Sequence, residues 1–494
     1  MITALPQLTL IRRRLLIKLT RIAVVLLVFI GLGKTAAAQQ MPFIQDVDSA
    51  KLKEVPLPPR PLSRRQIAIA ENKKRPGRAL IEFIGAELTP FVIDNNIRQV
   101  DYTHISWNTV GHNLKPSSWE WDNDNFQTNQ FGHPYHGSLF FSAYRANGYS
   151  FWQAAPAAMV GSYLWETFAE NQAPAPNDFI NTSFGGVVLG EMTYRLANKI
   201  VNNNKQRGAK HIATEIFGLL INPMNGLNRL MDGKWTKYNY SPADRDSSKI
   251  TAEFDIGLRK FSVGNNNPLH DGHFGWYGRA RLLYGSPYQD YRKPFSNISI
   301  MTEFGKDDST VVNTLSVYGS LAGWPIRSNG RFQHLAILSA NYDYIHNSAF
   351  FYGGQSVNIN LYSKMEPINK LQLNTALSAG AILLAAIPSQ YLYHGRNYDY
   401  GPGLSVSGSG GLNVADKFFY SINYRGGWIK TINGNSSHYF LHAITNEVSY
   451  RFANNISLCA ESGYFFLNGH YSTRPQDTKR YPYLRFSVRY TLNP

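Results

Sequence analysis

The second half of the chain alternates apolar and polar residues, and this pattern constrains the fold more than any other feature. From 250 to 259 every second residue is apolar, and the residues between them are mostly charged or small. The same alternation recurs at 276–284 and 484–492. A period of two is typical of a β-strand whose two faces meet different surroundings. We therefore predict that residues 249–494 form a sheet.

The length and spacing of these strands favour a transmembrane β-barrel over a soluble sandwich. The runs are long, turn-forming clusters such as Asn433-Gly434-Asn435 separate them, and the last run reaches the end of the chain. Outer-membrane barrels share these properties and have an even number of strands, roughly twelve here. A sandwich with a buried apolar face would look similar strand by strand. The predicted strands start near Lys249, His273, Ser296, Val311, Arg331, Ala349, Asn369, Gly403, Lys417, His438, Asn455 and Arg480.

The N-terminus predicts export. A basic segment to Arg21, an apolar segment at 22–32 and Ala36-Ala37-Ala38 together read as a signal peptide covering 1–38. An uncleaved anchor is the alternative. Residues 39–78 contain clustered prolines and basic residues with few large apolar ones. We read them as a disordered periplasmic tether.

Composition excludes several classes of protein. Mean hydropathy is −0.29, too low for a helical membrane protein. The 14% of aromatic residues suits a barrel in the outer membrane of a Gram-negative bacterium. The signal segment holds six of the 49 basic residues and none of the 33 acidic ones. The remaining surplus of basic residues favours contact with outer-membrane lipid, glycan or an anionic small molecule. We predict no nucleic-acid partner, because no binding motif accompanies the charge.

Residues 79–130 predict an amphipathic helix followed by a polar loop. Apolar residues recur at steps of three and four from 79 to 97, as one helix or as two interrupted at Pro90. In the loop, Asp122 and Asp124 resemble the start of a calcium site. The glycine and distal glutamate of such a site are missing. We predict no metal and no cofactor for the chain.

Residues 131–235 predict a helical module. Helices fit 137–147, 150–170, 177–201 and 209–220, and a polar, basic turn fits 228–235. We expect this module to plug or cap the barrel. The sequence does not indicate the oligomeric state.

Several motifs of this module resemble a known family. They are His133-Pro134-Tyr135-His136-Gly137, Arg145, Trp165-Glu166, Glu170, Pro176-Asn177-Asp178 and Gly190-Glu191. From Phe126 to Asn198 the chain is similar to an uncharacterised family of bacterial envelope proteins, domain of unknown function 3943. The resemblance implies a conserved structural unit and carries no activity with it.

The polar residues of the module admit two interpretations. As candidate catalytic residues, Glu166 and Glu170 would act as acid and base, with His133 and His136 moving protons. In the favoured structural alternative, the glutamates and Glu191 form ion pairs with arginines and fix the plug. A metal on His133, His136 and Glu166 and a nucleophilic Ser162 are weaker alternatives.

The charged residues of the module and of the barrel predict a binding function. In the module the candidate binding residues are Arg145, Asn177, Asp178, Glu191 and Arg195. In the strands the less apolar phase carries Arg259, Arg279, Arg281, Arg425, Arg451, Arg485 and Arg489. Partial pairing with acids of the same face would leave a mildly positive lumen that attracts carboxylate or phosphate groups.

These observations lead to three hypotheses of function. The first is a non-enzymatic outer-membrane barrel that binds or passes an anionic small molecule, lipid head group or glycan, with the helices as its plug. The second is an outer-membrane enzyme that acts on envelope lipid or cell-wall glycan. The third is a structural scaffold of the envelope.

Overall fold

We describe the protein from a computed structural model. It describes residues 74–492, apart from 205, 236–245, 247, 265–267, 289–290, 308–309, 329 and 348–350. The predicted signal peptide at 1–38 and most of the predicted tether lie outside the described residues.

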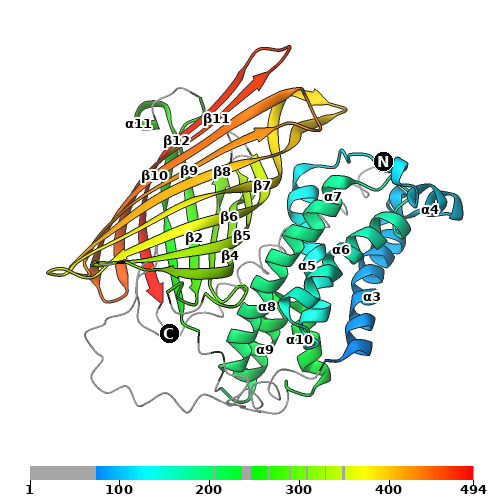
Figure 1. The fold of residues 1–494 in the computed structure, drawn as a ribbon, viewed down its shortest axis with the longest axis horizontal. Helices are drawn as coiled ribbons and strands as arrows, with labels where there is room; N and C mark the ends of the chain where they lie inside the picture. The colour runs from blue at the N-terminus through cyan, green and yellow to red at the C-terminus, as the bar shows by residue number, and fades with distance from the viewer. Residues whose placement is uncertain are drawn as a thin grey trace, which may run out of the picture.

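Twelve antiparallel strands form a closed barrel in which each strand pairs with its neighbours in the chain and β1 closes on β12 (Figure 1). The prediction of a β-barrel with about twelve strands is confirmed. The strands are β1 Ile250–Phe261, β2 His273–Tyr284, β3 Ile298–Asp307, β4 Thr310–Ile326, β5 Phe332–His346, β6 Phe351–Met365, β7 Leu371–Tyr393, β8 Arg396–Val414, β9 Phe418–Lys430, β10 Ser437–Ala453, β11 Ile456–Tyr471 and β12 Asp477–Leu492. We call the end where β1 begins and β12 finishes the near end, and the opposite end the far end.

The ion pairs show which face of each strand is the lumen. Arg279 on β2 contacts Glu447 on β10 and Glu461 on β11, although β1 and β12 separate these strands in the sheet. Side chains can meet in this way only across the interior of the barrel. Because successive residues of a strand point to opposite faces, Leu282 and its neighbours in register point outward.

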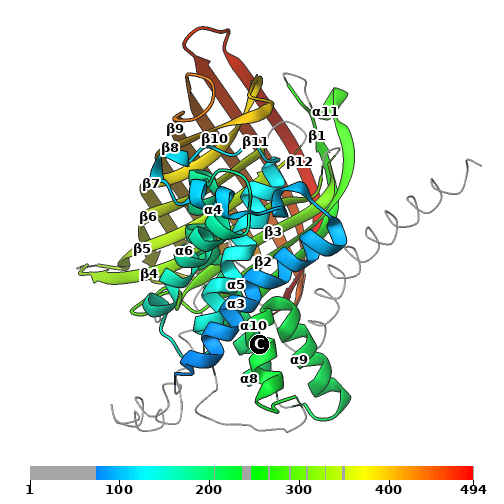
Figure 2. The same cartoon turned by 90° about the vertical axis from the view of Figure 1, so that its right-hand side faces the viewer.

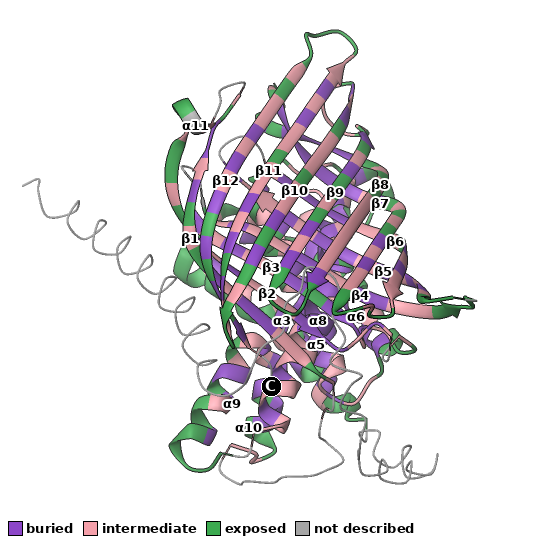
Figure 3. Ribbon diagram, turned by 90° about the vertical axis from the view of Figure 1, so that its left-hand side faces the viewer, coloured by how far each residue is buried: buried purple, intermediate pink, exposed green. Residues whose placement is uncertain are grey.

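Much of the outer face is apolar and exposed. On the strands near β9–β12, exposed residues alternate with buried ones along each strand (Figure 3). Large apolar side chains that project outward include Ile256, Leu258, Trp276, Ile359, Leu377, Leu404, Val406, Leu458, Phe486 and Val488. The predicted alternation is therefore correct in phase, with apolar residues outside and the charged residues in the lumen.

The helices precede the barrel and form one unit, residues 76–231, which we call the helical unit. Within the described residues, no helix combines the length and the apolar content needed to cross a membrane. Its helices are α3 Pro76–Ile93, α4 Trp107–Asn113, α5 His133–Arg145, α6 Phe151–Phe168, α7 Pro176–Ile180, α8 Gly186–Asn202, α9 Ala209–Ile221 and α10 Pro223–Met231. A short α11, Pro268–Asp271, lies between β1 and β2.

Two details of these helices refine the sequence interpretation. Helix α3 continues through Pro90 as one helix, and a π-helical turn at Asp94–Arg98 follows it. The segment predicted as a polar turn is partly helical, because α10 extends to Met231. This helix starts with proline, and the side chain of Asn222 accepts a hydrogen bond from the Asn225 N–H, 2.9 Å, which caps it.

The helical unit lies beside the barrel, against its outer wall. Figure 1 shows α5, α7 and α8 next to β4–β7, and in the turned view of Figure 2 α3 lies on the side away from the wall. Helices α9 and α10 extend past the near end of the barrel (Figure 1). The expectation that the helices plug or cap the barrel is therefore wrong.

The contacts follow one row of paired residues across the outer face of five strands. Ile300 pairs with Val317, Val317 with Tyr342, Tyr342 with Gln355, and Gln355 with Leu384. The Tyr342 hydroxyl donates to the Gln130 carbonyl oxygen, and Gln355 Nε2 donates to Asn181 Oδ1, 3.1 Å.

The apolar part of this interface joins helices and strands in one core. The ring of Phe126 packs on Tyr344 at 5.4 Å between centroids, and that of Phe151 packs on Phe295 at 5.4 Å. Leu189 and Met192 of α8 are buried in the same cluster as Ile298 and Val317. The helical unit and the wall therefore share a continuous hydrophobic core.

Candidate functional sites

The charged residues of the lumen form a network of ion pairs between distant strands. Arg279 contacts Asp255 at 2.6 Å and Glu461 at 2.5 Å, and Arg489 contacts Asp255 at 2.6 Å and Glu447 at 2.8 Å. The remaining pairs are Arg259–Glu303 3.1 Å, Arg281–Glu447 2.5 Å, Arg281–Glu253 3.2 Å, Arg485–Glu303 2.7 Å, Arg485–Glu461 3.1 Å and Arg425–Asp343 3.0 Å.

This network changes the expected character of the lumen. The six arginines in these pairs face six carboxylates, so their positive charge is balanced locally. The seventh predicted arginine, Arg451, lies over the ring of Phe419, 5.0 Å from its centroid. The expected partial pairing with acids therefore extends to six of the seven predicted arginines. The physical reason is that acids and bases far apart in sequence meet across the barrel.

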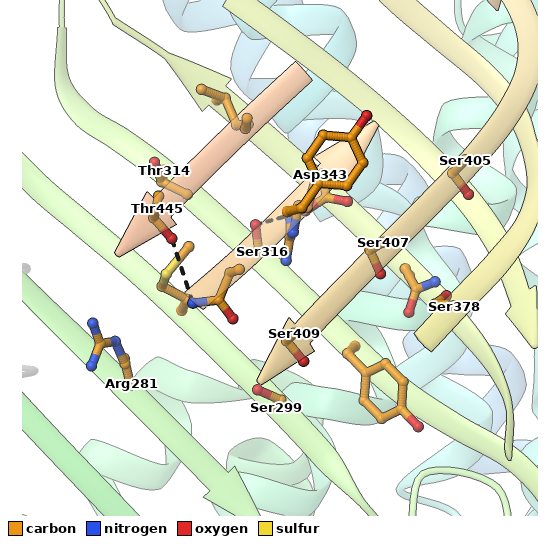
Figure 4. Close-up of a pocket in the computed structure, with 18 of the residues that line it drawn as sticks. Arg281, Ser299, Thr314, Ser316, Asp343, Ser378, Ser405, Ser407, Ser409 and Thr445 are labelled. Atoms are coloured by element: carbon orange, nitrogen blue, oxygen red, sulfur yellow. Dashed lines mark hydrogen bonds and ion pairs between the residues drawn. The ribbon is translucent and has the colours of Figure 1, made fainter. Parts of the chain in front are cut away.

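Residues of this network also line a cavity of about 370 Å³. In Figure 4 most of the labelled side chains carry hydroxyl groups and come from β3, β4, β7, β8 and β10, and Arg281 and Asp343 are labelled with them. The serine, threonine and asparagine residues of the lining are Asn297, Ser299, Asn313, Thr314, Ser316, Asn341, Asn347, Ser356, Asn358, Asn360, Ser378, Ser405, Ser407, Ser409, Ser421, Asn423 and Thr445. Such groups can donate and accept hydrogen bonds without carrying charge.

Apolar clusters of inward-facing side chains narrow the lumen on both sides of this cavity. Toward the far end, the ring of Phe261 stacks on Tyr481 at 5.3 Å and that of Phe465 stacks on Tyr483 at 5.7 Å. Toward the near end, Leu335 and Ile337 are buried against aromatic residues, including Tyr288 and Tyr291 of the segment between β2 and β3. These side chains occupy the lumen on both sides of the cavity.

The buried charged residues of the helical unit fall into two groups, and the first is an ion-paired core. Glu191 is fully buried and accepts from both Arg145 and Arg195, each at 2.7 Å. Arg195 Nη2 also donates to the Pro294 carbonyl oxygen, 2.7 Å, next to the barrel wall. The structural interpretation therefore fits Glu191, which ties α5 and α8 together and to the segment before β3.

The second group centres on Asp178 and reaches the barrel. His133 Nε2 lies 3.4 Å from Asp178 Oδ1, and Thr182 Oγ1 lies 3.4 Å from His133 Nδ1. Asn177 donates from Nδ2 to Asp178 Oδ1, 2.8 Å, and to the hydroxyl of Tyr400 on β8, 3.3 Å. His136 is elsewhere: its Nε2 contacts the Ala86 carbonyl oxygen at 3.0 Å.

Glu166 and Glu170 have no basic partner within the described part of the chain, so the ion-pair interpretation fails for them. Glu166 Oε2 accepts from the Ala175 N–H, 2.9 Å, and Glu170 Oε1 accepts from the indole N–H of Trp165, 2.5 Å. Asn113 donates to the backbone oxygens of both glutamates and so holds α4 on the end of α6.

Burial shifts the pKa values of the carboxylates and histidines around Asp178 and Glu166. It raises the pKa of Glu170 to about 7, and it raises the pKa values of Glu166 and Asp178 well above their ordinary range, with a further increase from the neighbouring carboxylates. Burial also lowers the pKa of His133 to about 3 and that of His136 to about 4. Both histidines are thus neutral near pH 7, so the contact between His133 and Asp178 is not an ion pair at that pH.

We predict that Glu170→Gln makes the stability of the helical unit less dependent on pH. Because the pKa of Glu170 is higher in the folded protein than its ordinary 4.5, the folded state binds more protons than the unfolded state. The contribution of Glu170 to stability is therefore fully present below about pH 4.5 and is lost as the pH rises through about 7. Urea titrations followed by tryptophan fluorescence at pH 4.5 and 8 should show this decrease in the wild type and a smaller one in Glu170→Gln.

The sequence interpretation missed residues that the barrel contributes to the helical unit. Asn129 Nδ2 donates to Asp122 Oδ2 at 2.9 Å and to the hydroxyls of Tyr398 and Tyr400 at 2.8 and 2.9 Å. Arg396 Nη1 donates to the Asp122 carbonyl oxygen, 2.8 Å. The sequence does contain a signal for these contacts. Outward positions that elsewhere hold aliphatic residues are occupied by Tyr398 and Tyr400 on β8 and by Gln355 on β6. Asp122 therefore has a structural role at the wall.

Several solved outer-membrane barrels are similar to the barrel part of the chain. The NanC porin is 10% identical, with a TM-score of 0.28, over 47% of this chain and 98% of that chain. The KdgM porin is 15% identical, with a TM-score of 0.23, over 48% and 98%. The CymD monoaromatic hydrocarbon channel is 9% identical, with a TM-score of 0.23, over 50% and 89%. No curated protein matches the chain.

A family model matches the central part of the helical unit. Residues 118–224 match the model described as "Domain of unknown function (DUF3943)". This range includes Asp122, Glu166, Asp178 and Glu191, so both groups of buried charged residues lie in the matched domain. The resemblance that the sequence motifs indicated is confirmed over this part of the chain.

Proposed function

We propose that this protein is a β-barrel of the bacterial outer membrane that binds a small, hydroxyl-rich solute of the saccharide type in its lumen. The outer-membrane location is supported by the closed sheet with its exposed apolar exterior, which is stable in hydrocarbon and costly in water. Outer-membrane lipid is then the partner of the wall. The candidate catalytic roles of Glu166, Glu170, His133 and His136 stay predictions.

One observation carries the proposed ligand class: serine, threonine and asparagine form the largest group of residues in the lining of the lumen cavity. Saccharide hydroxyls both donate and accept hydrogen bonds, and this lining can do the same. Aromatic faces at Tyr318 and Tyr362 border the cavity and suit the apolar faces of a sugar ring. Because the lumen arginines are paired, a neutral glycan fits better than an anion.

Ser407 and Val406 provide a matched test of this proposal. They are neighbours on β8 and both border the cavity, but the side chain of Ser407 points into it (Figure 4), whereas that of Val406 is 50% exposed on the outer face. We expect Ser407→Trp to fill the cavity and abolish binding of glucose and sucrose, measured by isothermal titration calorimetry of the refolded protein. Val406→Trp should leave this binding unchanged, because the added ring faces lipid or detergent.

The probes also separate the neutral ligand from the anionic one. We expect glucuronate to bind no more tightly than glucose, since its carboxylate meets arginines that already have partners. Tighter binding of glucuronate would favour the anionic ligand of the earlier hypothesis. If neither sugar binds to the wild type, the proposed ligand class is wrong.

A further inference from the structure

Helix α3 exposes an aliphatic stripe and buries a carboxylate beside the apolar Phe83. Its large aliphatic side chains Leu80, Ile84, Leu88 and Val92, spaced four residues apart, form one exposed stripe, and Leu88 is 54% exposed. The carboxylate of Glu82 on the same helix is buried, at 8% exposure, and accepts from Asn147 and Asn228. A surface helix in water normally turns its charged residues outward and its aliphatic residues inward.

Other helices of the unit repeat this arrangement. On α6, Trp152, Met159 and Val160 are exposed, whereas Ser162 and Glu166 are buried. On α9, Ile212, Ile216 and Leu220 form an exposed stripe with the same four-residue spacing, and Glu215 is buried in an ion pair with Arg229, 2.6 Å. The interior of the unit thus holds carboxylates, amides and hydroxyls, and large parts of its surface are aliphatic.

The position of the unit indicates what contacts its exposed aliphatic surface. The unit is attached to the outer wall of the barrel, and strands of the same wall expose large apolar side chains, for example Ile359 on β6 and Leu404 on β8. Helix α3, which carries the exposed stripe, lies on the side of the unit away from the barrel (Figure 2). Apolar area of this extent on a soluble protein marks a contact with another apolar phase.

We infer that the helical unit is immersed beside the barrel in the hydrocarbon of the bilayer, with the outer faces of α3 and α6 in contact with lipid acyl chains. The occupant is lipid because the apolar surface continues that of the wall, which faces the same phase. Polar interiors are tolerated in hydrocarbon when their groups are paired within the protein, as they are for Glu191 and Glu215. This inference depends on the membrane location of the proposed function, and the experiment below distinguishes the two.

Site-directed spin labelling tests the inference on the full chain. Cys459 is the single cysteine, so a Cys459→Ser background accepts one new cysteine at a time. Nitroxides at Ile84→Cys and Leu88→Cys probe α3, and Leu404→Cys, at a residue 60% exposed on the barrel wall, is the reference for lipid. Gln206→Cys, exposed between α8 and α9, is the reference for water. The protein is reconstituted in phosphatidylcholine vesicles.

We expect oxygen, which concentrates in hydrocarbon, to relax the labels at 84 and 88 as strongly as at 404. The water-soluble nickel chelate NiEDDA should relax them severalfold less than the label at 206. Labels at 84 and 88 that behave like 206 while 404 reports lipid would overturn the inference and leave the membrane location intact. Low accessibility to both reagents at 84 and 88 would mean a protein partner instead of lipid, and would overturn it too. Water-like behaviour at 404 itself would refute the membrane location.

Discussion

Replacing Arg489 with methionine is expected to lower the free energy of unfolding of the barrel by about 3–5 kcal/mol, the cost of removing one partner from a buried ion network. Arg489 is fully buried and contacts three carboxylates: Asp255 at 2.6 Å, Glu447 at 2.8 Å and Glu253 at 3.5 Å. Methionine fills a similar volume and leaves these carboxylates with one cation fewer. Urea unfolding in lipid vesicles, followed by the heat-modifiable mobility of the barrel in electrophoresis, measures the change.

The matched control for this prediction is Arg425→Met. Arg425 also faces the lumen and pairs with Asp343 at 3.0 Å, but its side chain is 55% exposed. A solvated pair of this kind contributes no more than about 1 kcal/mol, so this variant should unfold nearly as the wild type does. Equal unfolding of Arg489→Met and Arg425→Met would show that the network adds little to the stability of the barrel.

Replacing Gly186 with alanine is expected to destabilise the helical unit by about 1–3 kcal/mol, the usual cost of overpacking. Helices α5 and α8 cross with their backbones in contact. A Cβ atom on Gly186 would lie 2.5 Å from the carbonyl carbon of Gly137 and 2.6 Å from its Cα. Rigid backbone cannot yield as a side chain can, so the two helices must separate. Limited proteolysis in urea should cleave the helical unit of the variant at lower denaturant concentration.

Gly85→Ala in α3 is the control, and its expected effect on the stability of the helical unit has the opposite sign. A Cβ atom there meets nothing within 4 Å, and alanine favours a helix interior over glycine by about 0.5–1 kcal/mol. This variant should be at least as resistant to proteolysis as the wild type. If Gly186→Ala also keeps full resistance, the close contact of α5 and α8 does not limit the stability of the unit.

The sequence allowed prediction of the elements because local patterns determine them. The alternation at 250–259 and its repeats determined the strands, and steps of three and four gave most helices. The start of β8 was placed at Gly403, whereas the strand begins at Arg396. The polar outward residues Tyr398 and Tyr400 face helices instead of lipid, so the alternation is weak at that point.

The position of the helical unit and the charge balance of the lumen could not be predicted for a different physical reason. Both depend on which residues meet across the closed sheet. Arg279 and Glu461 are 182 residues apart, and the register that brings them together follows from closure of the barrel. Likewise, alternation on β5 shows that Tyr342 faces outward but not whether lipid or α-helix covers it. The candidate site was therefore predicted residue by residue, but not as the clusters that these residues form.

The attachment of the helices to β3–β8 makes the perimeter of the barrel unequal in the plane of the bilayer. One arc carries the helical unit, and the described residues place no helix of the unit against the other, formed by β9–β12, which we call the bare arc. A neighbouring β-barrel can approach closely only along the bare arc. Two copies that associated there would do so back to back, with their helical units pointing in opposite directions.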